Sequence, residues 1–206
     1  GYANASQADQ EKIERIMTHV MNRSNDSFYA YRNGSSMMAL TVYLRTGGPQ
    51  QAAARQALDR SFDQVIANQG RGGYWCYNNG SCNDSSTTQL VMAGLASARS
   101  VYSDPNDGDA NRLAQLNAAA TRTANAYQAN GAGGGLDNVE MGHGYSPNYD
   151  PSYQQTASGL WCQIIGGADI NNVGVRGYFR WLYNRYTYTS INAAPNNWPR
   201  GSTSSA

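Results

Sequence analysis

Two aspartates occupy equivalent positions in a sequence repeat, which would bring their carboxylates to the same end of the protein. Asp84 and Asp150 each come just before a predicted apolar helix, at equivalent positions. Paired carboxylates could perform acid–base chemistry or hold a sugar or a cation. Aspartate is also among the best helix N-cap residues, and we favour capping as the role of both.

Glu140 and His143 form the other acid and imidazole pair, in the segment Glu-Met-Gly-His-Gly-Tyr. Flanking glycines favour an exposed loop, and a histidine that titrates near neutral pH could act as a base or a metal ligand. The pair has no nucleophile and no third ligand beside it in the sequence, so polar contacts within the loop are the favoured interpretation. We therefore predict no metal site and no cofactor. Cys162, in an apolar segment, is expected to be a small buried side chain.

Aromatic residues, including 15 Tyr and 4 Trp, cluster in the predicted loops. Aromatic surfaces bind sugar rings by stacking and by hydroxyl hydrogen bonds, and they also form protein interfaces. Packing between helices accounts for a further share of them. The residues expected at a binding surface are Tyr29, Tyr31, Tyr74, Tyr77, His143, Tyr145 and Tyr149.

Cys76 and Cys82 enclose a short loop and could form a disulfide, which would leave Cys162 unpaired. A free thiol pair is the alternative, but we favour the disulfide and hence an oxidising compartment. The polar residues are mostly uncharged, which is more typical of an extracellular surface. We predict an extracellular or cell-surface location, with the periplasm as an alternative. Asn-X-Ser sequons, which matter only where secreted chains are glycosylated, begin at Asn4, Asn22, Asn25, Asn33, Asn79 and Asn83.

The overall charge excludes some partners. The 206 residues suit one domain, or a piece of a larger one, and carry a formal net charge of +1 with 14% charged residues. This balance argues against a nucleic-acid or acidic-membrane partner. The longest apolar runs, such as 37–44, are too short to span a bilayer. Because the chain begins at Gly1 rather than Met, we expect a processed or trimmed product.

Seven helices are expected from hydrophobic periodicity, at 8–22, 35–45, 50–68, 85–101, 110–129, 152–165 and 173–186. The first of each successive pair is amphipathic and the second is more apolar, which is typical of a helix buried among others. Polar loops are expected at 24–33 and, rich in glycine, at 131–149. Residues 188–206 are expected to be an irregular C-terminal tail.

A repeat is visible in a pair consisting of a small residue and Leu, at 39–40, 94–95 and 159–160. An aromatic cluster precedes each pair. Helix, aromatic loop and helix therefore recur as α-hairpins, at about 8–46, 50–101 and 110–165, with a further helix at 173–186. Each hairpin needs its neighbours to cover its apolar face, so we predict one repeat domain over 8–187. Small residues on the second helices would let these helices pack closely.

The motifs of this repeat resemble a known group. Residues 69–75, Gln-Gly-Arg-Gly-Gly-Tyr-Trp, fit the Gln-x-x-x-Gly-x-Trp motif of squalene–hopene cyclases and their relatives. Residues 84–89 and 153–160 are similar to the inner-helix openings of prenyltransferase and squalene-oxidase repeats. The resemblance covers roughly 8–187 and implies an all-α fold, a partial or complete α/α toroid of inner and outer helices. It also implies that Gln69, Gly73 and Trp75 are structural and tie successive hairpins together.

The chain departs from this family where the chemistry lies. The Asp-x-Asp-Asp motif with which such cyclases protonate their substrate is missing from the sequence. Protein prenyltransferases bind zinc through Asp, Cys and His, but His19 and His143 are the only histidines and neither has a matching motif. Three and a half hairpins are fewer than the six of a closed toroid, so we expect an open arc, a fragment or half of an oligomeric ring.

These observations favour a secreted or cell-surface repeat module that binds or assembles rather than catalyses. The expected partner is a glycan, a peptide or another protein at the aromatic loops, or a second copy of the chain. The alternative is an enzyme of the α/α-toroid class, either a terpenoid cyclase or prenyltransferase relative or a polysaccharide-cleaving enzyme, on analogy of fold alone.

Overall fold

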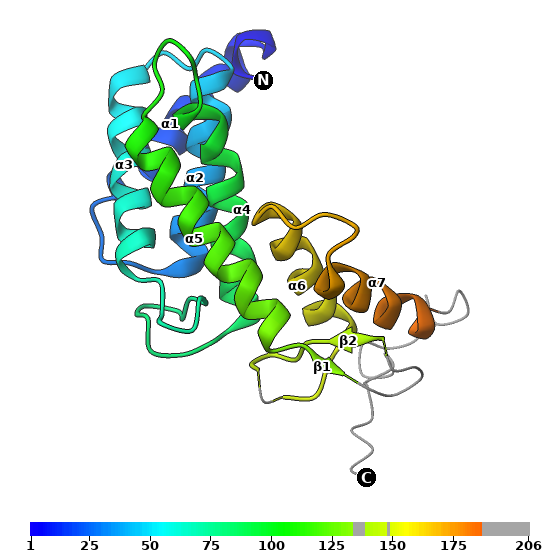
Figure 1. Ribbon diagram of the computed structural model, residues 1–206. Helices are drawn as coiled ribbons and strands as arrows, with labels where there is room; N and C mark the ends of the chain where they lie inside the picture. Colours follow the sequence, from blue (N-terminus) through cyan, green and yellow to red (C-terminus); the bar gives the residue numbers. More distant parts are fainter. Residues whose placement is uncertain (134–138, 148, 187–206) are drawn as a thin grey trace.

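The computed structural model describes residues 1–133, 139–147 and 149–186, and they are mostly helical, as predicted (Figure 1). The helices are α1 (Gln7–Arg23), α2 (Ala30–Arg45), α3 (Gln51–Ala67), α4 (Ser85–Tyr102), α5 (Ala110–Ala129), α6 (Tyr153–Ile165) and α7 (Val173–Arg185). A 3₁₀ turn, η1 (Tyr2–Asn4), precedes α1. The two-residue strands β1 (Ala132–Gly133) and β2 (Met141–Gly142) pair antiparallel. No helix of the described ranges is long and apolar enough to cross a membrane.

The helices pack in two rows. Helices α2, α4 and α6 contact one another in that order, and we call them the inner helices. Helices α1, α3, α5 and α7, here called the outer helices, also contact one another in order, and each lies against at least one inner helix. Figure 1 shows α1 and α3 towards one end of this arrangement and α6 and α7 at the other.

The inner helices run parallel, because N-terminal ends contact N-terminal ends and C-terminal ends contact C-terminal ends. At the N-terminal ends of α2 and α4, the Tyr31 hydroxyl donates to Ser86 Oγ at 2.9 Å. At their C-terminal ends, Arg45 pairs with Asp104 at 2.6 Å. Helices α4 and α6 are joined near their C-terminal ends by Arg99, which donates to the Ile165 carbonyl at 3.1 Å. Parallel packing brings the three helix N-termini to one end of the protein.

Two glycines let α2 and α4 approach closely, as the small residues of the repeat predict. A Cβ atom on Gly94 would lie 2.8 Å from the carbonyl oxygen of Gly34, and a Cβ on Gly34 would collide with the Leu90 carbonyl. Only glycine fits such a backbone approach without movement of one helix. The close contact fixes the spacing of the inner helices.

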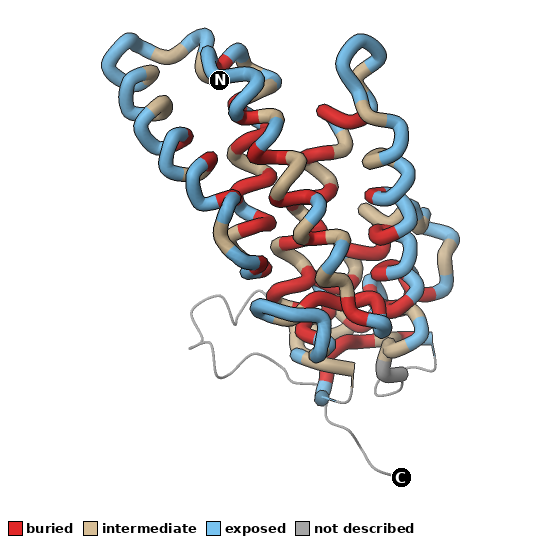
Figure 2. Tube along the Cα trace, turned by 90° about the vertical axis from the view of Figure 1, so that its left-hand side faces the viewer, coloured by how far each residue is buried: buried red, intermediate tan, exposed pale blue. Residues whose placement is uncertain are grey.

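The core lies between the two rows, where Figure 2 shows the buried residues concentrated. Its largest fully buried side chains are mostly aromatic and include Trp75, Trp181, Tyr74, Tyr102, Tyr127, Tyr178 and Phe62. Large aromatic side chains bury the most apolar area per residue, which makes them effective fillers between helices. This use of aromatic residues in the core decides which of the predicted binding residues remain on the surface.

Helix α2 begins at Ala30, five residues earlier than the sequence predicts. The Asn33 side chain accepts a hydrogen bond from the Tyr29 amide at 3.0 Å, and the Tyr77 carbonyl accepts one from the Ala30 amide at 2.7 Å. These bonds satisfy amides of the first turn that would otherwise lack partners. The predicted loop over 24–33 is therefore too long, and Tyr31 belongs to a helix. The predicted irregular tail at 188–206 lies outside the described residues.

Candidate functional site

Five tyrosines gather at the N-terminal ends of the inner helices, and we call this group the tyrosine rim. Its members are Tyr29, Tyr31, Tyr77, Tyr145 and Tyr149. Two come from the start of α2, one from the loop before α4 and two from the loop before α6. All three hairpins therefore contribute to one surface, which the parallel arrangement of the inner helices makes possible.

The rings of the tyrosine rim contact one another and remain open to solvent. The ring centroid of Tyr31 lies 6.1 Å from that of Tyr29 and 5.8 Å from that of Tyr77. The Tyr145 and Tyr149 rings lie 6.3 Å apart. The exposed fraction is 37% for Tyr77, 40% for Tyr145 and 63% for Tyr149. The rim thus offers several accessible aromatic faces at fixed spacing.

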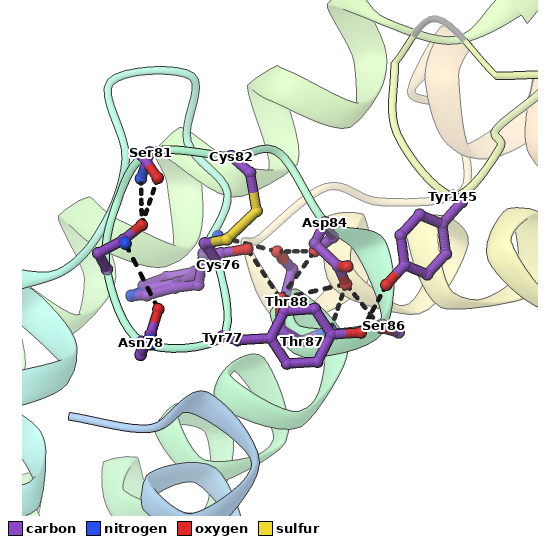
Figure 3. Close-up of a disulfide and its surroundings, with 12 residues drawn as sticks. Cys76, Tyr77, Asn78, Ser81, Cys82, Asp84, Ser86, Thr87, Thr88 and Tyr145 are labelled. Atoms are coloured by element: carbon purple, nitrogen blue, oxygen red, sulfur yellow. Dashed lines mark hydrogen bonds between the residues drawn. A yellow bond between two sulfur atoms is a disulfide. The ribbon is translucent and has the colours of Figure 1, made fainter.

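A disulfide holds the loop that carries Tyr77 (Figure 3). Cys76 and Cys82 are bonded, with their Cα atoms 5.1 Å apart, so the predicted pairing is confirmed. Cys162 is fully buried, as predicted. The Tyr77 carbonyl accepts the hydrogen bond from the Ala30 amide, which ties the loop to the start of α2. Tyr77 therefore sits on a segment fixed at two points.

Asp84 lies behind the tyrosine rim and caps α4. Its side chain accepts from the Thr87 amide at 2.8 Å and from Ser86 Oγ at 2.6 Å, and the residue is only 2% exposed. These are the bonds of an N-cap, so the favoured role of Asp84 is confirmed.

Two groups of hydroxyl hydrogen bonds lie at the tyrosine rim near Asp84, around which Figure 3 shows Tyr77, Ser86 and Tyr145. In one group the Tyr31 hydroxyl donates to Ser86, which donates to the carboxylate. In the other the hydroxyl oxygens of Tyr77 and Tyr145 lie 2.6 Å apart. The pKa of Tyr145 is raised, first by its hydrogen bond to Asp84 and then by the one to Tyr77. Either hydroxyl can donate in the bond between Tyr77 and Tyr145.

The direction of these bonds fixes what the Tyr31 hydroxyl can offer a ligand. Tyr31 has one hydroxyl proton, and it points inward through Ser86 to Asp84. Its oxygen keeps lone pairs that accept hydrogen bonds. The tyrosine rim therefore combines aromatic faces with one oriented acceptor.

Tyr74 and His143 do not belong to this surface, which corrects the sequence prediction of a binding role for both. They are 0% and 1% exposed. The Tyr74 hydroxyl lies 2.9 Å from His143 Nε2, and His143 Nδ1 lies 2.7 Å from the Gly144 carbonyl and 3.1 Å from Ser85 Oγ. Their hydrogen bonds are made within the core, because the loop before α6 folds back over α4 and α5.

Burial also removes His143 from general-base chemistry. Desolvation lowers the pKa of His143 to about 4, with partial compensation from the hydrogen bond to the Gly144 carbonyl. The imidazole is therefore neutral at pH 7 and donates from Nδ1 to that carbonyl, which leaves Nε2 to accept from Tyr74. A neutral ring enclosed by tyrosines serves packing and hydrogen bonding.

Glu140 is likewise engaged in the fold. Its carboxylate receives two hydrogen bonds from Arg185, at 2.8 and 3.0 Å, and one from Asn184 at 2.9 Å. The Glu140 side chain is fully buried and that of Arg185 is 9% exposed. Arg185 also lies over the Trp181 ring, 4.2 Å from its centroid. This paired carboxylate anchors the loop before β2 to α7, as the favoured structural interpretation predicts.

Asp150 does not match Asp84, contrary to the predicted equivalence. Asp150 is exposed, and α6 is capped by Ser152, whose Oγ accepts from the Gln155 amide at 3.2 Å. The Ser152 amide donates to the His143 carbonyl at 3.1 Å, which fixes the cap two residues after Asp150. The predicted carboxylate pair therefore consists of one buried cap and one exposed side chain.

Gln69 and Gly73 connect the second hairpin to the third, whereas the hydrogen bond of Trp75 stays within the second hairpin. Gln69 Nε2 donates to the Ala119 carbonyl on α5 at 3.0 Å. Gly73 has a φ of +85°, and a Cβ there would lie 2.8 Å from the Arg122 carbonyl. Trp75 is fully buried, and its Nε1 donates to the Val65 carbonyl at 2.8 Å.

Ser86 is the functional residue that sequence reasoning missed. It transmits the hydrogen bond from Tyr31 to Asp84, but a serine in the first turn of a capped helix carries no distinguishing signal. Within the described ranges, no group of three or more His, Cys, Asp and Glu side chains is placed to hold a metal ion. The chain matches no protein-family model, and no curated protein or solved structure is significantly similar to it.

Proposed function

We propose that the chain is a secreted or cell-surface helical-repeat module that binds a saccharide at the tyrosine rim. In this proposal the hairpins form an open arc of the α/α-toroid kind, in line with the resemblance to cyclase and prenyltransferase repeats. The disulfide between Cys76 and Cys82 is compatible with an extracellular location. Binding, rather than turnover, is the activity that we assign.

One observation carries this proposal: the hydroxyl proton of Tyr31 is directed through Ser86 towards Asp84, beside the exposed rings of Tyr77 and Tyr145. A ligand at the rim then needs hydroxyl or amide donors next to an apolar face that stacks on tyrosine. A pyranose ring has both, since its C–H face packs on aromatic rings and its hydroxyls donate. A peptide offers fewer donors per unit of stacked area, so we favour a saccharide.

The geometry of Asp84 supports binding over catalysis. One of its oxygens accepts hydrogen bonds from Ser86 and from the amide and hydroxyl of Thr87. A carboxylate oxygen engaged in this way orients its neighbours within the fold. A glycosidase would need a second carboxylate facing it across the ligand, and Asp150 caps nothing and stands outside this hydrogen-bonded group.

The test is a binding screen with defined oligosaccharides. Hexasaccharides of glucose, mannose, xylose and N-acetylglucosamine, in α and β linkage, are titrated into the protein by calorimetry. The best ligand is then titrated into the variants Tyr77→Phe and Tyr183→Phe. We expect Tyr77→Phe to weaken binding roughly five- to tenfold, the effect of one hydrogen bond. Tyr183→Phe is the matched control, because Tyr183 is exposed on α7 outside the tyrosine rim.

Either of two results would overturn the proposal. One is the lack of binding by every hexasaccharide up to millimolar concentration. The other is a ligand whose affinity Tyr77→Phe and Tyr183→Phe reduce equally, which would place the binding surface elsewhere.

A further inference from the structure

The sequence contains three Asn-Gly pairs, at 33–34, 79–80 and 130–131. Asparagine followed by glycine is prone to deamidation, because glycine has no side chain to hinder its own backbone nitrogen. This nitrogen attacks the carbonyl carbon of the asparagine side chain and closes a ring. Ring closure needs an unbonded nitrogen, a backbone outside a helix and a side chain that is not held elsewhere. The structure meets these conditions at one of the three pairs.

The first pair is locked in a helix. Asn33 lies in the first turn of α2 and is 2% exposed. Its Oδ1 accepts from the Tyr29 amide at 3.0 Å, and its Nδ2 donates to Gln64 Oε1 at 2.7 Å. Gly34 belongs to the same helix, where each backbone nitrogen donates to a carbonyl one turn earlier. Both the Asn33 side chain and the nitrogen that would attack it are therefore engaged.

The third pair is held at the end of α5, where Asn130 is the C-cap. Its Nδ2 donates to the Ala126 carbonyl at 2.8 Å, and its backbone amide donates to the same carbonyl at 3.0 Å. Gly131 is closely packed, since a Cβ atom there would lie 3.1 Å from the Tyr178 ring. The Asn130 side chain is thus bonded through the nitrogen that deamidation would release.

The second pair lies in the disulfide loop 76–82, outside every helix and strand of the described ranges. Asn79, Gly80 and Ser81 are all exposed. The Gly80 amide donates no hydrogen bond to any residue that the structure describes. Asn79 Nδ2 makes a single long contact, at 3.4 Å, with Oδ1 of Asn78, which Figure 3 shows in this loop. The attacking nitrogen and the leaving nitrogen are both accessible here.

Ser81 prepares the Asn79 side chain for attack. Asn79 Oδ1 accepts hydrogen bonds from the Ser81 amide, at 3.0 Å, and from the Ser81 hydroxyl. Two donors on one carbonyl oxygen polarise the carbonyl group. They also stabilise the negative charge that this oxygen gains when a nucleophile adds to the carbon, which is the principle of an oxyanion hole.

We infer that Asn79 is a modification site, at which the folded chain deamidates without an enzyme. The Gly80 nitrogen gives its proton to solvent and bonds to Cγ of Asn79. The bond from Cγ to Nδ2 then breaks, and Nδ2 takes up a proton and leaves as ammonia. The product is a succinimide ring. Water opens the ring at either carbonyl carbon, which gives an aspartyl or an isoaspartyl residue at position 79.

This modification changes the segment that carries Tyr77. Either product adds a carboxylate to an exposed turn next to the tyrosine rim. The isoaspartyl product also adds a carbon to the backbone, close to the hydrogen bond in which the Asn79 carbonyl accepts from the Cys76 amide at 3.2 Å. Since Asn79 begins an Asn-X-Ser sequon, deamidation and glycosylation at this position exclude each other.

The test is peptide mapping by mass spectrometry. The 206-residue chain is produced with its disulfide in a host that does not glycosylate asparagine, and is incubated at pH 8 for several weeks. We expect Asn79 to be converted at least about tenfold faster than Asn33 or Asn130, a difference of about 1.4 kcal/mol in activation free energy. The same chain in urea, with its disulfide kept, is the control. Without the fold, the three asparagines should react at similar rates.

The role of Ser81 is tested by the variant Ser81→Ala, which removes the hydroxyl donor and keeps the backbone amide. It should slow conversion of Asn79 in the folded chain roughly two- to tenfold, the effect of one hydrogen bond. Ser103→Ala is the matched control, because Ser103 is an exposed serine that follows α4. It should leave the rate unchanged.

Three results would overturn the inference. The first is an Asn79 that stays intact in the folded chain, and the second is conversion of Asn33 or Asn130 at the rate of Asn79. The third is equal selectivity among the three asparagines with and without urea, because the sequence alone would then decide the site.

Discussion

The hydroxyl oxygens of Tyr77 and Tyr145 lie 2.6 Å apart although the residues are 68 positions apart in the chain. The pair joins the disulfide loop of the second hairpin to the loop before α6. The contact places two exposed rings side by side at the N-terminal end of α4. The tyrosine rim therefore depends on the correct placement of hairpins relative to one another.

This contact predicts energetic coupling between Tyr77 and Tyr145. The variants Tyr77→Phe, Tyr145→Phe and the double variant form a double-mutant cycle. We expect a coupling free energy between about 0.5 and 1.5 kcal/mol, as for other directly bonded side chains, measured by urea unfolding. The pair Tyr77→Phe and Tyr183→Phe is the control and should be additive. Additivity in the Tyr77 and Tyr145 cycle would show that the hydrogen bond contributes nothing to stability.

The disulfide is expected to stabilise the protein by restricting the unfolded chain. The variant Cys76→Ser, Cys82→Ser opens a loop with a sequence separation of 6. A loop this short predicts a loss of about 2 kcal/mol in the free energy of unfolding, measured by urea denaturation. Treatment of the native chain with reductant should lower its denaturation midpoint to that of the variant. If reductant leaves the native midpoint unchanged, the bridge has no stabilising role.

Asp84 and Asp150 offer a direct comparison between a cap and an exposed carboxylate. Asp84→Ala should lower the free energy of unfolding by about 1 kcal/mol, because the Thr87 amide loses its acceptor. Asp84→Asn should restore most of this loss, since asparagine also caps helices well. Asp150→Ala should change the free energy by less than about 0.5 kcal/mol. An equal cost for both alanine variants, measured by thermal or urea unfolding, would contradict the assignment of the cap.

Because His143 is buried in its neutral form, we expect the protein to lose stability in mild acid. The pKa of His143 in the folded protein is about 4, below the ordinary histidine value of 6.5 expected in the unfolded chain, so the unfolded chain takes up the proton first. The contribution of His143 to the free energy of unfolding is fully present above pH 6.5. It falls by up to about 3 kcal/mol as the pH decreases towards 4. Urea midpoints at pH 7 and 4.5 measure the effect. The difference between the two midpoints should become smaller in His143→Gln. It should persist in His19→Gln, whose side chain is exposed.

Local patterns predicted the helices well, because hydrophobic periodicity is carried by neighbouring residues. The 110–129 helix was predicted with its observed ends, and Asp84 was recognised as a cap from its place before an apolar run. The start of α2 was missed because it depends on the Tyr77 carbonyl, which comes from another hairpin. Contacts between hairpins set this boundary, and periodicity contains no information about them.

The candidate site was predicted in part for the same reason. Tyr29, Tyr77, Tyr145 and Tyr149 are exposed, as a binding surface would require, but the sequence could not distinguish the exposed Tyr77 from the buried Tyr74. Tyr74 is buried because Tyr127 and His143 approach it from other hairpins. The direction of the hydroxyl bonds depends on Ser86, for which the sequence has no signal.

The last prediction concerns the hydrogen bonds by which Gln69 links the second hairpin to the third. Its amide nitrogen lies 3.0 Å from the Ala119 carbonyl and 3.1 Å from Thr123 Oγ1, both on α5. Gln69→Ala removes both bonds and should lower the free energy of unfolding by about 1 to 3 kcal/mol, because acceptors at a packed contact lose their donor. Gln56→Ala is the matched control on the exposed face of α3 and should cost less than about 0.5 kcal/mol in the same urea experiment. Equal costs would mean that the amide of Gln69 does not stabilise the contact between the second hairpin and the third.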